Sequence, residues 1–265
     1  MKRPSSAATA VALIPASANL AELRRRAAGC TACELYRRAT QSVFGAGPLR
    51  ARVILVGEQP GNEEDLTGEP FVGPAGRVLD AALARAGIDR GEIYVTNIVK
   101  HFKWEPRGKR RIHAKPSAGE VAACRPWFEA ELARIRPDVL VALGATAAQG
   151  LLGRAVRVRA QRGQFLPSPL APRVMVTVHP SAILRSRDDA ERHREMEHFV
   201  RDLRGVAAAL RPTGNRSRSS SRLPNPRCPR TSDRLCETER TAPSREGPRA
   251  TARPRARGPA GPSRR

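Results

Sequence analysis

Aromatic residues, cysteines and long apolar runs are all scarce in this sequence. Phe, Trp and Tyr make up 4% of the 265 residues, and no apolar run approaches the ~18 residues of a membrane-spanning helix. Five cysteines are too few for a disulfide scaffold in a chain of this length. The apolar run at residues 11–15 is too short, and wrongly flanked, for a secretory signal. We therefore expect a cytoplasmic protein with reduced thiols and no membrane association.

Acidic residues are also in the minority. The chain has 48 Lys and Arg against 25 Asp and Glu, which gives a net charge of +23. Such an excess favours a polyanionic partner, above all nucleic acid, although a general arginine bias of the genome would produce it too.

Charge and turn-forming residues concentrate towards the C-terminal end. Residues 211–265 hold 15 Arg, 9 Pro and no aromatic residue. So little apolar surface cannot offset the entropy of ordering the backbone, so we expect this segment to be a disordered Arg/Pro-rich tail. It is either a nonspecific nucleic-acid arm or an extension without a selected role. Residues 1–17 are expected to be flexible, which leaves one folded domain over residues 18–210.

Residues 18–210 alternate between strand and helix patterns. Four short apolar runs predict buried strands at 52–57, 93–97, 138–144 and 173–178. Helical spacing, with capping residues or terminal glycines, predicts helices at 19–28, 76–86, 117–136, 145–152 and 188–210. Pro126 is expected to kink or split the third of these helices. The alternation predicts a three-layer α/β/α fold around a central four-stranded parallel sheet.

The predicted strands end in polar or small residues, at the edge where open parallel sheets bind their ligands. Gly57-Glu58-Gln59 follows the first strand, Asn97 ends the second, and His179-Pro180-Ser181 follows the fourth. A carboxylate, two amides and an imidazole are thus expected in one crevice. Acids at 63–65 extend this rim without a phosphate-binding Gly/Lys loop, which argues against a kinase or nucleotide hydrolase. Phe71 is either a core residue or a stacking face for a base.

Three cysteines of the predicted domain have the spacing of metal ligands. Cys30 and Cys33 form a C-x-x-C pair after the first helix, and Cys124 lies on the third. Cys228 and Cys236 fall in the predicted tail and are excluded. From spacing alone, zinc and an iron–sulfur cluster are equally good occupants.

Four motifs together resemble the uracil-DNA glycosylase superfamily, and most closely its iron–sulfur, family 4-type branch. They are GEQPG at 57–61, EPFVGPAG at 69–76, VTN at 95–97 and HPS at 179–181, and the similarity covers residues 20–205. Two departures resemble the UdgX subgroup. GEQPG replaces the more usual GEAPG, and a basic KRRIH loop is inserted at 109–113. UdgX proteins excise uracil and then stay covalently bound to the DNA through the histidine of this loop.

The resemblance implies a role for each matching residue. Phe71 would stack on the flipped uracil, Asn97 would read its polar edge, and His179 would stabilise the departing anion. Glu58 and Gln59 would act at the sugar and the base, and His113 would attack C1′ of the deoxyribose. Asp65 would help to shape the pocket. The other implied substrate-binding positions are Gly57, Lys109, Arg110, Arg111 and Ser181. The basic residues among them would bind phosphates or hold the loop against the core.

The resemblance also implies a [4Fe–4S] cluster. Family 4 proteins carry a cysteine directly after the lysine that follows the second strand, where this chain has His101. His101 would therefore be the fourth ligand beside Cys30, Cys33 and Cys124. The expected role of the cluster is structural, clipping the first helix to the core and positioning the loop at 101–113.

Three functions remain open on the sequence. The first is a monomeric glycosylase that acts on uracil-containing, single-stranded DNA and ends as a covalent adduct through His113. The second is a conventional, turnover glycosylase in which the basic loop only grips phosphates. The third is a nucleic-acid-binding module that has lost catalysis, against which the intact Glu58, Gln59, Asn97 and His179 speak.

Overall fold

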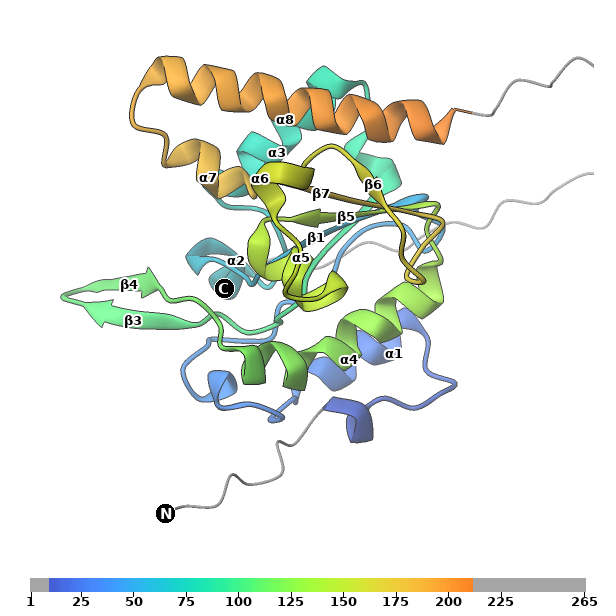
Figure 1. The fold of residues 1–265 in the computed structure, drawn as a ribbon. Helices are drawn as coiled ribbons and strands as arrows, with labels where there is room; N and C mark the ends of the chain where they lie inside the picture. The colour runs from blue at the N-terminus through green and yellow to red at the C-terminus, as the bar shows by residue number, and fades with distance from the viewer. Residues whose placement is uncertain (1–9, 212–265) are drawn as a thin grey trace, which may run out of the picture. The chain divides into compact units, whose positions relative to one another are not determined.

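The computed structural model describes residues 10–211, which fall in one compact unit. Its strands form a five-stranded sheet in the order β2-β1-β5-β7-β6 and a separate two-stranded hairpin, β3-β4 (Figure 1). The strands are β1 (Val53–Gly57), β2 (Ile93–Asn97), β3 (Trp104–Arg107), β4 (Arg110–His113), β5 (Val139–Leu143), β6 (Phe165–Leu166) and β7 (Arg173–Thr177). The α-helices are α1 (Leu20–Ala28), α2 (Asn62–Thr67), α3 (Pro74–Ala86), α4 (Ala118–Ile135), α5 (Ala145–Leu152), α6 (Val158–Gln161), α7 (Pro180–Leu184) and α8 (Asp189–Leu210). Short 3-10 helices lie at η1 (Ala10–Leu13), η2 (Glu34–Arg37) and η3 (Arg90–Glu92).

The central sheet separates two helical layers, as predicted. Every residue of β1, β2 and β5 is buried, because successive side chains of each strand point into opposite layers. Ile54 and Val56 pack in the core that α1, α4 and α5 complete. Val53 and Leu55 pack in the other core, beneath α3 and α8. Figure 1 shows α3 and α8 on one side of the sheet and α1 and α4 on the other, which confirms the three-layer α/β/α fold.

The four predicted strands are the parallel members of the sheet, and their register sets the site. Gly57 at the end of β1 pairs with Asn97 at the end of β2, so two motif residues lie side by side. The sheet also has a fifth, antiparallel strand, β6, which pairs with β7 at its edge. The sequence did not reveal β6 because a two-residue strand has no readable alternation.

The helix boundaries follow the local signals in the sequence. Asn19 caps α1 by accepting from the backbone N–H of Glu22, and Ser117 forms a capping box with Glu120 at the start of α4. Helix α3 begins two residues earlier than predicted, because Pro74 occupies its first turn. Pro126 does not split α4, which runs without interruption over 18 residues, so of the expected kink or split the split was wrong.

Part of the expected flexible N-terminus is packed on the domain. Ala10 in η1 is fully buried, and η1 contacts α4. The guanidinium of Arg134 on α4 donates to the backbone carbonyls of Ala16 and Ala18. Leu13 and Ile14 also pack against the core, so the folded part begins before residue 18.

The remaining expectations for the ends of the chain concern residues 1–9 and the tail at 212–265, with Cys228 and Cys236, and they lie outside the described residues. Among the helices of residues 10–211, none combines the length and the hydrophobicity that a membrane crossing requires.

Candidate functional site

Three side chains converge above Gly57, at the carboxyl ends of β1 and β2, where we place the candidate base pocket. A β-carbon added to Gly57 would collide with Oδ1 of Asn97 and would lie 2.8 Å from Cζ of Phe71 and 3.4 Å from Nε2 of His179. Three predicted base-contacting side chains therefore converge on one point, from three separate segments of the chain. Only glycine lets the side chains of Asn97 and Phe71 approach the end of β1 this closely. The structure thus brings together the residues that the sequence placed in a base pocket.

Phe71 closes one side of the pocket in a strained backbone conformation. Its φ of 58° is positive, which a bulky residue rarely adopts. The conformation is held by the start of α3, where a β-carbon on Gly76 would collide with the carbonyl of Phe71. The ring is 7% exposed, and its centroid lies 6.1 Å from that of His179 at an interplanar angle of 31°. An aromatic face so placed can stack on a flat base.

His179 precedes α7 and is held in one tautomer. The backbone N–H of Ser181 donates to Nδ1 over 3.2 Å, which leaves the ring proton on Nε2, the atom that faces the pocket. Burial, with smaller contributions from the charges of Arg185 and His113, lowers the pKa of His179 to about 4. Arg185 also donates to the hydroxyl of Ser181 over 3.0 Å. The imidazole is therefore a neutral hydrogen-bond donor at neutral pH, suited to an oxygen that gains negative charge.

Glu58 and His113 face one another at the mouth of the pocket. Nε2 of His113 lies 3.4 Å from Oε1 of Glu58, and the two side chains are 50% and 21% exposed. Partial burial lowers the pKa of His113, the carboxylate of Glu58 opposes this, and Arg185 lowers it again. A neutral imidazole keeps a lone pair on one ring nitrogen, which is what a nucleophilic histidine requires.

His113 ends β4, on a hairpin that Gln59 clamps at its base. Nε2 of Gln59 donates to the carbonyls of Lys103 and Ala114, each over 3.1 Å, and Oε1 accepts from the N–H of Lys103 over 3.1 Å. Lys103 and Ala114 directly flank the two strands of the hairpin. Both amide protons of Gln59 are thus committed to this clamp. This differs from the predicted role of Gln59 at the sugar and the base.

Arg111 pins the same hairpin to the body of the protein. Its Nη1 lies 2.6 Å from Oδ2 of Asp65, and its Nε donates to Asn62 over 2.8 Å. Asp65 is fully buried and also accepts from the backbone N–H of Thr40. The guanidinium lies over the ring of Trp104 at 5.5 Å. The basic loop residues were predicted either to bind phosphates or to hold the loop against the core. Arg111 holds the hairpin against the core, through its ion pair with Asp65.

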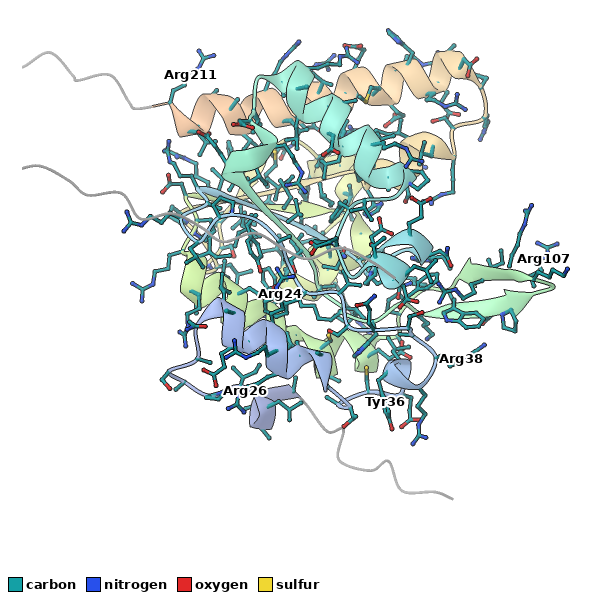
Figure 2. The ribbon with its side chains drawn as sticks, turned by 180° about the vertical axis from the view of Figure 1, so that it is seen from behind. Arg24, Arg26, Tyr36, Arg38, Arg107 and Arg211 are labelled. Carbon is teal, nitrogen blue, oxygen red and sulfur yellow. The ribbon has the colours of Figure 1, made fainter. Side chains whose placement is uncertain are left out.

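The outer end of the hairpin carries the free positive charge. Gly108, with a φ of 58°, and Lys109 form the two-residue turn, and both Lys109 and Arg110 are exposed. Figure 2 shows Arg107 at the end of the hairpin, well away from the body of the protein. Nearer the body, Arg38 lies over the ring of Trp104 at 4.6 Å. Lys109 and Arg110 are thus exposed to solvent, and their contact with phosphates stays a prediction.

The predicted cluster ligands lie at the junction of the N-terminal segment, the exit of β2 and α4. Cys30, His101 and Cys124 are 5%, 4% and 3% exposed, and Cys33 is half-buried. Burial, together with the neighbouring Cys33 and Cys30, raises the pKa of Cys124 to about 12, although Lys100 opposes the rise. Burial likewise raises the pKa of Cys33, with Cys30 contributing. The three thiols therefore lie close enough to influence one another.

The chemistry of the donor set, three thiols and one imidazole, suits an iron–sulfur cluster and zinc alike. Within residues 10–211 no three His, Cys, Asp or Glu side chains are arranged to hold a single ion. Two N–H groups already point at the sulfurs: Nε1 of Trp127 donates to Cys30, and the backbone N–H of Lys100 donates to Cys124, each over 3.2 Å. Such hydrogen bonds are typical of thiolates that bind iron–sulfur clusters.

Sequence reasoning missed three contributors to this region. Arg185 follows Ser181 by one helical turn and was readable from the helical spacing after HPS. Trp104 on the hairpin had no motif to mark it. The ion pair of Lys100 with Glu131 joins residues 31 apart, and only the folded chain brings them together.

Comparisons with known proteins identify the family of this fold and site. The model of the uracil DNA glycosylase superfamily matches residues 44–204. The chain is 41% identical over 169 residues to the type-4 uracil-DNA glycosylase of Thermotoga maritima, covering 63% of this chain and 84% of that protein. It is 33% identical over 174 residues to the type-4 uracil-DNA glycosylase of Pyrobaculum aerophilum, covering 63% of this chain and 85% of that protein. The protein belongs to the uracil DNA glycosylase superfamily.

Proposed function

We propose that this protein excises uracil from single-stranded DNA as a monomer, and that His113 then bonds to C1′ of the deoxyribose. Membership of the family supports the glycosylase activity. The observation that carries the covalent step is the position of His113, with Nε2 3.4 Å from the carboxylate of Glu58 at the mouth of the base pocket.

The pocket residues supply the first step. A base must leave its stack to reach Gly57, where Phe71 offers an aromatic face and Asn97 offers an amide. As the N1–C1′ bond breaks, its electron pair stays on uracil and positive charge develops on the sugar. The neutral Nε2–H of His179 stabilises the first charge, and the carboxylate of Glu58 stabilises the second.

His113 competes with water for the sugar cation. In a conventional glycosylase, water attacks C1′ and the abasic product leaves. Here His113 reacts with its ring proton on Nδ1: the lone pair of Nε2 forms the new C–N bond, and the positive charge of the sugar passes to the resulting N-alkyl imidazolium, beside Glu58. Proximity gives His113 a very high effective concentration relative to water. The product has no easy leaving group, so each molecule reacts once.

We also propose that Cys30, Cys33, His101 and Cys124 hold a [4Fe–4S] cluster, with zinc as the alternative occupant. When bound, the cluster would act as a structural clip between α1 and α4. The burial of these donors and the two N–H···S bonds support this assignment.

The test is a denaturing gel with a labelled, uracil-containing single-stranded oligonucleotide. The wild-type protein should give a slow band that survives heat and detergent, and His113→Ser should not. His198→Ser is a matched control, because His198 is 45% exposed on α8, outside the pocket. Uracil released in excess over enzyme, without the slow band, would establish the conventional glycosylase instead. No release and no band, with iron confirmed in the protein, would support the binding module.

A further inference from the structure

A fully buried ion pair lies directly behind the base pocket, and the reaction described above does not use it. Nζ of Lys100, at the exit of β2, lies 2.6 Å from Oε2 of Glu131 on α4, and the two side chains are 1% and 0% exposed. Removing both charges from water costs more than their attraction usually returns, so an apolar pair of the same volume would be at least as stable. Stability alone therefore does not account for this pair.

Every hydrogen-bonding group of the pair is occupied. The ammonium of Lys100 donates to Glu131, to Oγ1 of Thr96 over 2.6 Å and to the backbone carbonyl of Asn97 over 2.8 Å. The carboxylate of Glu131 also accepts from the N–H of Gly45 over 2.9 Å and from the hydroxyl of Tyr94 over 3.0 Å. A network in which every donor and acceptor has a partner is rigid, and it holds the groups bonded to it in one arrangement.

The network contacts the backbone carbonyl of Asn97, on the side away from Gly57. The peptide group that follows Asn97 is held on both sides: its carbonyl accepts from Nζ of Lys100, and its N–H, on Ile98, donates to the carbonyl of Gly57 over 2.9 Å. The next N–H, on Val99, donates to the carbonyl of Glu58 over 3.0 Å. The fixed peptide plane sets where the side chain of Asn97 leaves the backbone, and its Oδ1 lies directly in front of Gly57.

We propose that Lys100 and Glu131 are positioning residues for uracil recognition, which orient the side chain of Asn97 through its own backbone carbonyl. The inference rests on the proposed function, in which Asn97 reads the polar edge of the base. Lys100 never touches the substrate. Its ammonium replaces the water that would otherwise bind the carbonyl of Asn97, and so it removes the freedom of that peptide to rotate.

The decisive variant is the double substitution Lys100→Met/Glu131→Gln. Glutamine keeps the acceptor for Gly45 and Tyr94, and methionine fills most of the volume of the lysine stem, so no charge is left buried and unpaired. The main loss is the donor to Asn97. We expect single-turnover uracil release to fall by about ten- to a hundredfold, the range of one hydrogen bond from a charged donor. The fraction of released uracil that ends in the covalent adduct should not change, because the hairpin is untouched.

Three measurements separate positioning from a general structural role. The melting temperature of the double variant should stay near that of the wild type. Lys100→Met alone should lower it, because the charge of Glu131 would be buried without a partner. Iron content should also stay at the wild-type level, although the backbone of Lys100 contacts Cys124. Arg85→Met/Glu197→Gln is the matched control, an ion pair between α3 and α8 that should leave uracil release unchanged.

Two results would overturn the proposal: a folded, iron-replete double variant that releases uracil at the wild-type rate, or a loss of release that tracks a loss of iron. A wild-type protein that releases no uracil would refute the proposed function instead. In that case the crystal structure of the double variant still tests whether Lys100 and Glu131 position Asn97. The amide of Asn97 should turn away from Gly57, and an unmoved amide would refute the positioning role.

Discussion

Replacing Gln59 by alanine should loosen the β3–β4 hairpin without altering the base pocket. The side chain is 6% exposed and makes three hydrogen bonds, two to the carbonyls that flank the hairpin and one from the N–H of Lys103. At roughly 0.5–1.5 kcal/mol for each bond, the clamp contributes about 3 kcal/mol. The pair of Arg111 with Asp65 still holds the hairpin, so only part of this energy acts on the position of His113.

We therefore expect Gln59→Ala to slow adduct formation by about ten- to a hundredfold and uracil release by less than threefold. The two rates are read from one reaction, the adduct from a denaturing gel and the released uracil by chromatography. Gln59→Glu should be at least as damaging, since it keeps the acceptor for Lys103 but turns two attractive contacts into repulsive ones. Gln164→Ala, an exposed glutamine beside β6, is the control. Adduct formation at the wild-type rate in Gln59→Ala would refute the clamp.

Three further predictions concern the pocket, the hairpin anchor and pH. Gly57→Ala should lower uracil release at least tenfold, because its β-carbon would displace the side chains of Asn97 and Phe71. Gly119→Ala, whose β-carbon would meet only Oγ of Ser117 at 3.9 Å, should leave release unchanged. Asp65→Asn leaves Arg111 without its buried carboxylate and should cost about 3–5 kcal/mol in urea denaturation, and an effect below about 1 kcal/mol would contradict the anchor. The free energy of unfolding should rise with pH between about 4 and 6.5, because unfolded His179 takes up a proton there that folded His179, with its pKa of about 4, does not. His179→Asn should flatten this rise, and an identical profile in the variant would argue against the lowered pKa.

Much of the fold was readable from local patterns. The continuous apolar runs identified all four parallel strands, because a strand covered on both faces has no polar alternation to obscure it. Capping residues such as Asn19 and Ser117 marked helix starts, since their side chains bond within one turn. The convergence of Asn97 and His179 was also predictable, because the carboxyl ends of parallel strands meet at one edge of the sheet.

The sequence by itself determined which chemical groups stand at that edge, and the tertiary structure decided what each of them does. A residue that leaves a strand can turn in several directions, so only the packing around Gln59 shows that its amide faces the hairpin rather than the base. Arg111 meets Asp65 across 46 residues, and Lys100 meets Glu131 across 31. Such pairs carry no periodic signal in the chain, because the energy that selects them exists only once both partners are buried together.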